Sequence, residues 1–401
     1  MSVCTPTSTV VGQNVKLTTA MQTLAGDIAK ILRNHSQARV IVESFDPPNN
    51  IGGGDNLQIQ RRLKEALDRQ VGVDVVDETQ IVRLSCWSVR GEYSIKHRKD
   101  PATQTMTTRA QVTARIFDQE NSEQMEIAPF PIEISDLSDL TVLANATFDA
   151  GESANSKNKA SQVAAQLTAS IQKPNISIDA DQGRIAASDS SPYAIELLIS
   201  EGLSTPPKKR DYVADATRIE KNEFTLKEGE LGFAVADLRA GEFYAVQLHN
   251  DSNRDVAVKL YVDGLSSFEF TEIASYKQTD HWIVPARSSA VVYGWHRTNE
   301  FSDSFEIAHL PETAIGQSGR SNASAGIIQA VFFQAWSQGE TPPAGEITRG
   351  VALDSLATKP GAKITTDYVE LRRFTSKTPI ASIAVRYNKP KDDLPPSIVS
   401  N

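Results

Sequence analysis

Cysteine is nearly absent from this 401-residue chain, which contains only Cys4 and Cys86. Two thiols form neither a disulfide framework nor a four-cysteine zinc site. The six histidines include no pair four residues apart, so the helical zinc-binding motif is excluded as well. No glycine-rich segment is followed by Lys and then Ser or Thr, as a P-loop requires. The sequence therefore predicts no metal site and no cofactor.

Long apolar runs are also missing. No stretch of about 20 apolar residues exists, so no transmembrane helix is predicted. The first residues lack a basic start and an apolar core, so no signal peptide is visible in the chain as numbered. A complete chain of this kind would be cytoplasmic, whereas a chain whose leader had been removed would be exported. The localisation stays open at this point.

Positive charge is in the minority, with 41 Lys and Arg against 50 Asp and Glu and a formal net charge of −9. An acidic chain repels phosphate backbones, so we expect no nucleic-acid partner. One dense basic run, Lys208–Arg210, follows two prolines and is expected in a solvated loop.

A catalytic constellation is not recognisable. Nucleophilic catalysis needs a Ser, Cys or Thr with a nearby base, and none of the six histidines stands in such a pattern. The segment Gly316–Arg320 misses the G-x-S-x-G spacing by one residue and lies in a Ser/Asn/Gly-rich loop. We therefore predict no catalytic residues and no enzymatic activity. A hydrolase whose carboxylates cannot be paired from the sequence remains the alternative.

What the sequence does contain is the pattern of a globular α+β protein, with more residues than one ordinary core accommodates. A mixed α/β pattern is followed by many short strands separated by polar turns, which is typical of an antiparallel β-sandwich, here of a jelly-roll-like kind. The expected organisation is a flexible tail (1–16), a mixed α/β domain (17–135), a connector with one helix (136–192), a β-sandwich domain (193–389) and a second tail (390–401).

The α/β domain has its own order of elements. Apolar spacing and turn residues predict a helix ending near Asn34, a strand over 38–45, a helix capped by Asp55 and Gln58, and a strand over 72–77. A helix between two short strands indicates a βαβ crossover, right-handed if the strands are parallel. The connector helix is expected over 156–172.

A long hairpin should follow, with strands over 88–97 and 107–117 and a polar, Pro-containing loop between them. The segment 125–134 is expected to return as an antiparallel edge strand because it contains Pro129 and Pro131. Strand edges expose unpaired backbone groups that proteins either protect or use for association. We therefore regard His97 and Arg115, on the two hairpin strands, as candidate contact residues.

Four segments carry a resemblance to a known family: Leu63-Lys-Glu-Ala-Leu, Val73-Asp-Val-Val-Asp-Glu-Thr-Gln-Ile, Arg90-Gly-Glu-Tyr-Ser-Ile and Thr113-Ala-Arg-Ile-Phe-Asp. Over 18–135 the chain resembles the α/β domain shared by the curli-secretion channel lipoprotein and the lipoprotein activators of penicillin-binding proteins. The resemblance implies a bacterial protein that binds and assembles, periplasmic or envelope-associated if a leader was removed.

The C-terminal part is similar in outline to β-sandwich domains of unassigned role found in diverse bacterial proteins. The matching residues are Asn250-Asp-Ser, Val258-Lys-Leu-Tyr-Val-Asp-Gly, Pro285 and Gly294-Trp295. Aromatic rings in such domains can stack on sugars, so Trp282 and Trp295 are candidate interaction residues. The competing interpretation is that these rings fill the interior of the sandwich.

The sequence therefore predicts a non-enzymatic binding or assembly protein that acts through a protein partner or self-association. The alternative is a carbohydrate-binding or surface-adhesion module, for which sugar would be the ligand.

Overall fold

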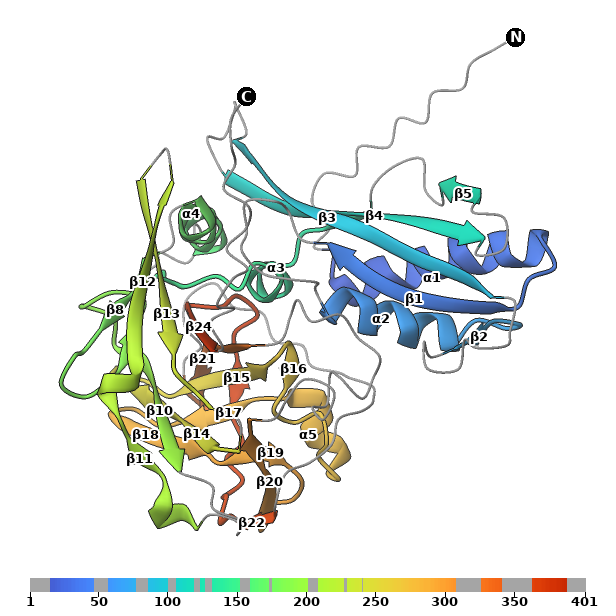
Figure 1. Ribbon diagram of the computed structural model, residues 1–401. Coiled ribbons are helices and arrows are strands. Elements are labelled where there is room, and N and C mark those ends of the chain that lie inside the picture. Colours follow the sequence, from blue (N-terminus) through green and yellow to red (C-terminus); the bar gives the residue numbers. More distant parts are fainter. Residues whose placement is uncertain are drawn as a thin grey trace.

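The computed structural model has a mixed α+β fold rich in antiparallel sheet (Figure 1), which confirms the expected fold class. It describes residues 15–46, 57–76, 86–99, 106–118, 123–126, 132–151, 159–172, 175–200, 208–226, 229–239, 241–307, 326–340 and 363–387. The expected cap at Asp55, the prolines of 125–134, the segment Gly316–Arg320 and the tail 390–401 lie outside these residues.

The N-terminal half is built on a six-stranded sheet of order β2-β1-β3-β4-β5, with β6 also paired to β4. Strands β1 and β2 are parallel, as the βαβ pattern requires, β1 and β3 are also parallel, and the remaining pairs are antiparallel. The bounds are β1 (Arg39–Asp46), β2 (Asp74–Val75), β3 (Trp87–Lys99), β4 (Met106–Asp118), β5 (Glu123–Glu126) and β6 (Ile132–Ile134).

Three helices cover one face of this sheet: α1 (Leu17–Asn34), α2 (Leu57–Asp68) and α4 (Lys159–Gln172). Side chains alternate along a strand, so Val89 and Tyr93 of β3 point to the same face as Val112 and Ile116 of β4. All four are buried in one core with the apolar sides of the helices. Within the described residues, no helix is long and apolar enough to cross a membrane.

Gly91 lies within β3, where that strand pairs with the end of β1. It pairs with Phe45, next to a register shift in β1. A Cβ atom on Gly91 would lie 2.1 Å from the carbonyl oxygen of Thr113 and 2.7 Å from the Phe45 ring. Any side chain there would push the ring or the strand away, so the segment Arg90-Gly-Glu is a packing requirement of this sheet.

The hairpin strands β3 and β4 are longer than the strands beside them. β1 pairs with β3 only as far as Glu92. In place of the single strand expected over 125–134, β5 pairs with β4 over Arg115–Asp118 and β6 pairs with it over Ala110–Val112. Among the described residues, no strand pairs with the outer edge of β3 over residues 94–99. The end of the hairpin therefore extends past its sheet (Figure 1).

The C-terminal half contains two nine-stranded sheets whose side chains share one core. The first contains β8 (Ser177–Ile178), β9 (Ile185–Ala186), β10 (Tyr193–Ser200), β11 (Val213–Ala214), β14 (Phe243–Asn250), β18 (Ser288–Val292), β19 (Gly294–His296), β20 (Phe301–Glu306) and β22 (Lys363–Thr365). The second contains β7 (Phe148–Asp149), β12 (Ile219–Leu226), β13 (Gly229–Ala236), β15 (Val256–Val262), β16 (Leu265–Ser266), β17 (Trp282–Val284), β21 (Ile327–Trp336), β23 (Phe374–Thr375) and β24 (Ala381–Tyr387). Pairing is antiparallel except between β13 and β24, and one short helix, α5 (Ala274–Thr279), interrupts the strands.

The expected Asp263-Gly264 turn joins β15 to β16. Both residues have positive φ, 51° and 75°, which is the conformation that a two-residue hairpin loop requires. The Asp263 carboxylate accepts hydrogen bonds from the backbone N–H of Gly326, at 2.7 Å, and from the hydroxyl of Tyr387. The turn therefore also fixes the start of β21 and the end of β24.

The segment between the two halves contains more structure than the one helix expected for 136–192. It holds α3 (Leu137–Leu143), β7, α4, β8 and β9. α3 begins at Asp136, whose carboxylate accepts from two backbone N–H groups of its first turn. Figure 1 shows α3 between the N-terminal sheet and the strands β21 and β24.

α3 belongs to both cores. Leu140 and Leu143 are buried with the α/β sheet, whereas Val142 packs on the outer side of β15 and β21, against Val331 and Phe333. Immediately after α3, β7 pairs with β24 and becomes a strand of the second sheet.

Gln329 of β21 completes this junction. Its side chain is 2% exposed, and Nε2 donates to the backbone oxygen of Thr141 in α3 and to the Ser382 hydroxyl of β24, each at 3.1 Å. The backbone of a short helix is thereby tied to the centre of a sheet.

We expect Gln329→Ala to lower the free energy of unfolding by about 1–3 kcal/mol, because the buried oxygen of Thr141 loses its side-chain donor. Chemical denaturation measures this loss. Gln247→Ala, which removes a side chain bonded to Ser289 near the surface of β14, is the matched control and should cost less than about 0.5 kcal/mol. Equal losses in the two variants would contradict the role of Gln329 at the junction.

Candidate functional site

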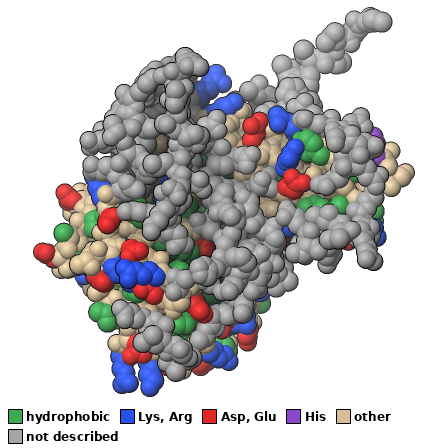
Figure 2. Space-filling view, in the orientation of Figure 1, with side chains coloured by type: hydrophobic (Ala, Val, Ile, Leu, Met, Phe, Trp, Pro, Cys, Tyr) green, Lys and Arg blue, Asp and Glu red, His purple; other side chains and the backbone are tan. Residues whose placement is uncertain are grey.

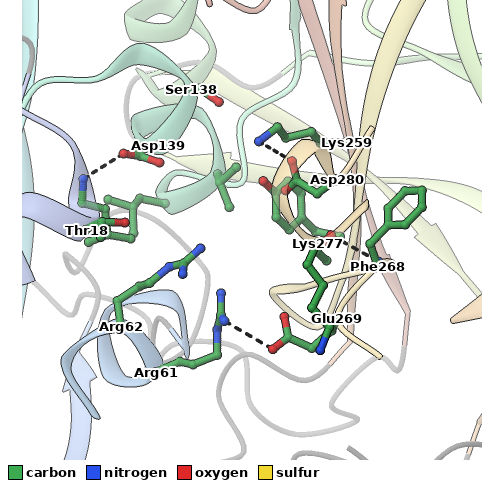
Figure 3. A pocket seen from close by; sticks show the side chains of 15 residues that line it. Thr18, Arg61, Arg62, Ser138, Asp139, Lys259, Phe268, Glu269, Lys277 and Asp280 are labelled. Carbon is green, nitrogen blue, oxygen red and sulfur yellow. Dashed lines mark hydrogen bonds and ion pairs between the residues drawn. The ribbon is translucent and has the colours of Figure 1, made fainter. Parts of the chain in front are cut away.

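A polar cavity lies where α1, α2 and α3 meet β15, β16 and α5, and its volume is about 120 Å³ (Figure 3). Charged side chains from both halves of the chain line it. The cations are Arg61, Arg62, Lys259 and Lys277, and the carboxylates are Asp139, Glu269 and Asp280. This volume holds a few water molecules or a small polar group, and leaves no room for a larger ligand.

Arg61 joins α2 to the β-rich half. Its Nη1 donates to Glu65 Oε1 at 2.8 Å within the helix and to Glu269 Oε1 at 3.3 Å across the junction. The side chains of Arg61 and Glu269 are only 6% and 7% exposed. Because a buried charge is costly unless it is paired, these two groups favour the arrangement in which the halves stay together.

Two further cations of the cavity, Lys259 and Arg62, are held in their charged forms. Burial opposes the charge on Lys259, but Asp280, at 2.7 Å, together with Tyr261 and Asp139, outweighs it and raises the lysine pKa. Burial also opposes the charge on Arg62, and the carboxylates around it, led by Glu65, raise its pKa. Neither group can therefore serve as a base near neutral pH.

Asp139 is a buried carboxyl group of the cavity with a raised pKa. Burial, with a smaller effect of Asp136, raises its pKa to about 6, although its Oδ2 accepts from the backbone N–H of Leu17 at 2.8 Å. That hydrogen bond caps α1, whose own N-cap residue, Lys16, makes no side-chain cap. Figure 3 shows Asp139 and Arg62 on the same side of the cavity, reached from α3 and α2.

These contacts make the cavity part of a charged interface between the two halves. Glu269 is paired with Arg61 across the two halves, and Asp280 is paired with Lys259. The charged groups of the cavity therefore form ion pairs both within one half and between the halves.

A second hollow, of about 530 Å³, is open to the surface beside β7 and the turn after β14. Polar and small residues line it, including Asp149, Asp251, Asn253 and Arg287. None of the described lining residues is aromatic, so the hollow lacks the flat ring on which a sugar would stack.

The second candidate surface is the face of the β3–β4 hairpin opposite the helices, here called the open face. It presents Arg90, Glu92, Ser94, Lys96 and Arg98 from β3, and Thr107, Arg109, Gln111, Thr113, Arg115 and Phe117 from β4. Figure 2 shows Lys and Arg side chains along the upper part of the molecule, interleaved with acidic ones, over this hairpin.

Like charges stand directly opposite each other on the open face. Arg90 pairs with Arg115, and Lys96 pairs with Arg109. Such cross-strand pairs are destabilising, typically by a few tenths of a kcal/mol to about 1 kcal/mol, unless neighbouring groups compensate. Here the compensation is partial: Arg115 lies 3.6 Å from Glu92, and Arg109 lies 2.5 Å from Glu133 of β6.

The sequence-predicted contact residues fall in different environments. Arg115 is on β4 between β3 and β5, so it lies on the open face but not at an edge. His97 lies on β3 in the stretch 94–99, to which no described strand pairs on the outer side, and its register partner across the hairpin is Thr108. The role of both residues in association stays a prediction.

The two predicted tryptophans lie in the core of the β-rich half. Trp282 is 8% exposed, and its indole N–H donates to the Ser267 hydroxyl at 2.8 Å. Trp295 is 7% exposed and lies edge-on to Phe305 and Phe270. These positions agree with the interpretation that the rings fill the interior.

The residues that match the β-domain outline also have structural roles. The Asn250 amide donates to the backbone oxygens of Val284 and Pro285, and its oxygen accepts from the Ser252 N–H. A Cβ on Gly294 would lie 2.0 Å from the backbone oxygen of Asp303 in the neighbouring strand. The outline therefore describes a turn and a close strand pairing, and none of its contacts indicates a ligand.

Sequence reasoning missed the basic character of the hairpin. The run Lys96-His-Arg-Lys is as dense as Lys208–Arg210, but it continues a strand pattern and was interpreted only as part of that strand. The signal that could have identified it is the alternation of Arg90, Lys96 and Arg98 on one face. The cavity residues are ordinary surface charges in the sequence, and nothing local brings Arg61 and Glu269 together.

We expect a double-mutant cycle of Arg61→Met and Glu269→Gln to give a coupling free energy of about 1.5–3 kcal/mol, because both charges are buried at the junction. The exposed pair Arg109–Glu133, with side chains 45% and 41% exposed, is the control and should give about 0.2–1 kcal/mol. Denaturant unfolding of the four variants in each cycle measures both values. A coupling for Arg61–Glu269 no larger than that of the control would show that the junction does not depend on this pair.

The raised pKa of Asp139 predicts a pH dependence of stability. The folded protein binds this proton more tightly than the unfolded chain, so the contribution of Asp139 is largest below about pH 4 and is lost as the pH rises through about 6. The control is Asp139→Asn, which keeps an acceptor for the Leu17 N–H. The free energy of unfolding of the wild type, relative to that of Asp139→Asn, should fall by on the order of 1–2 kcal/mol between pH 4 and 7. Urea unfolding of both proteins across this range measures the difference, and a difference that stays constant or rises with pH would contradict the assignment.

Comparison of the chain with models of known protein families, with curated proteins and with solved structures found no match. The function proposed below therefore rests on the geometry of the described residues and on the resemblance visible in the sequence.

Proposed function

We propose that this chain is a non-enzymatic binding or assembly protein, and that it takes up an extended segment of a protein partner along the edge of β3. The observation that carries the proposal is the stretch 94–99, to which no described strand is paired on its outer side. An exposed strand edge offers a row of N–H and C=O groups that a further strand can satisfy.

The edge is held in position before any partner arrives. The Tyr93 hydroxyl donates to the backbone oxygen of Leu143 at 3.3 Å, and the Thr108 and Thr168 hydroxyls are 3.0 Å apart. These contacts fix the hairpin on α3 and α4, so an added strand would not have to order it. Pre-organisation of this kind lowers the entropic cost of binding.

The junction supports the same proposal. α3 is shared by both cores, and Arg61 is paired across the boundary with Glu269. A hairpin mounted on such a junction is presented at a fixed angle to the β-rich half. A fixed geometry suits a protein that joins other chains into an assembly.

We propose further that the two sheets of the C-terminal half, which share one core, form a jelly-roll-like β-sandwich, and that this sandwich acts as a scaffold. The resemblance of 18–135 to envelope lipoproteins supports a bacterial, envelope-associated assembly. The carbohydrate-binding alternative receives less support, because Trp282 and Trp295 are buried, at 8% and 7% exposure.

The test uses the purified full chain and an array of ten-residue peptides of varied composition. We expect a subset with β-forming residues to bind. For the strongest binders, N-methylation of the alternate amides that face β3 should weaken binding at least tenfold, because each ladder hydrogen bond contributes about 0.5–1.5 kcal/mol. The matched control is N-methylation of the other alternate set, which faces away from β3 and should have little effect.

Strand addition is excluded if no peptide binds, or if both N-methylated sets lose affinity equally. Binding that is limited to glycans on a parallel array, and is reduced in a Trp282→Phe variant of unchanged stability, would instead favour the adhesion alternative.

A further inference from the structure

Two positive side chains on the open face stand beside the edge of β3 to which no described strand pairs. Lys96 and Arg98 are both exposed and lie within the stretch 94–99. Across the hairpin they face Arg109 and Thr107. Among the described residues, no carboxylate lies within 4 Å of either side chain, and Glu133 of β6 is bound by Arg109.

The remaining cations of the open face already have acidic neighbours. Arg90 lies 4.0 Å from Glu43 of β1, and Arg115 lies 3.6 Å from Glu92. Positive charge without a described counter-charge is therefore concentrated at the part of the hairpin where no described strand pairs with the outer edge of β3. The whole chain has a formal net charge of −9, so this concentration of positive charge is a local property of the hairpin.

The geometry of strand pairing fixes where a partner's side chains would lie. A strand added beside β3 alternates its side chains between the two faces of the sheet. One set would lie next to Lys96 and Arg98 on the open face. The other set would lie beside Tyr93 and Ile95, which face the apolar core under the hairpin.

We propose that the partner segment is an extended polypeptide in which acidic residues alternate with apolar ones. Its acidic side chains pair with Lys96 and Arg98, and its apolar side chains extend the core beside Ile95. This inference rests on the proposed strand addition and names the class of partner for that same edge.

A peptide is favoured over a nucleic acid for two reasons on the open face. Glu92 and Glu133 lie among the cations and would repel a phosphate backbone that followed the hairpin. The unpaired edge of β3 also offers backbone hydrogen bonds, which a polypeptide strand can match residue by residue.

The experiment measures binding of four ten-residue peptides to the full chain by fluorescence anisotropy at low and physiological salt. The peptides are Glu-Val alternating, Gln-Val alternating, Lys-Val alternating, and an isomer of the first in which Glu and Val occur in blocks. We expect the Glu-Val alternating peptide to bind at least tenfold more tightly than each of the others, and its affinity to fall as salt rises.

The variant Lys96→Glu/Arg98→Glu should weaken the Glu-Val peptide at least tenfold and strengthen the Lys-Val peptide. Its fold should be retained, because Lys96→Glu places an acidic side chain opposite Arg109. Arg210→Glu, at a side chain 78% exposed in the other half of the chain, is the matched control and should leave both affinities unchanged.

The outcomes separate the two proposals. If the Gln-Val peptide binds as tightly as the Glu-Val peptide, strand addition stands and the acidic partner is wrong. If a single-stranded oligonucleotide binds more tightly than every peptide and loses affinity in the double variant, the site recognises polyanions and the acidic peptide is wrong. If none of these ligands binds, and the random peptide array is also negative, both proposals fall.

Discussion

The docking of α3 is the interaction on which the rest of the structure depends. This helix has only seven residues, and its backbone could not stay helical alone. It persists because Asp136 caps its start, Leu140 and Leu143 enter one core, and Gln329 donates to its backbone from the other half. A chain with two separate cores is thereby held as one body at this point. The charged cavity beside α3 strengthens the joint, because separation of the halves would leave Arg61 and Glu269 without each other.

Because the two halves are held together rigidly at α3, the long β3–β4 hairpin of the N-terminal sheet is presented in a fixed position. β3 and β4 run beyond their neighbours, and their projecting part is supported by α4, while no described strand pairs with the outer edge of β3 there. Proteins usually protect such an edge with charge, and Lys96 and Arg98 would hinder pairing with a second copy of the same basic strand. The same charges would attract an acidic strand. The hairpin therefore combines protection against self-pairing with selection of a partner, and both follow from the placement of two side chains.

Local patterns in the sequence predicted the local structure well. The apolar spacing of α1 and the alternation of Val112 and Ile116 are properties of single elements, and each predicted its element to within a few residues. The short helix α3 was missed because its seven residues show no helical period and its stability comes from Gln329, which is 188 residues from the Thr141 oxygen that it binds. The cavity was missed for the same reason, since Arg61 and Glu269 are 208 positions apart. The free edge of β3 depends on where β1, β5 and β6 end, and those ends are set by tertiary packing.

Site-resolved amide hydrogen exchange on the unliganded full chain tests the central claim most directly. If the outer edge of β3 is free, alternate amides within 94–99 should exchange rapidly, while the amides of 87–92, which lie between β1 and β4, should all be slow. The alternation is essential, because it separates a stable strand with one open edge from a frayed hairpin, in which every amide would exchange. Uniform protection through 94–99 would mean that another strand already occupies the edge, and would contradict the account.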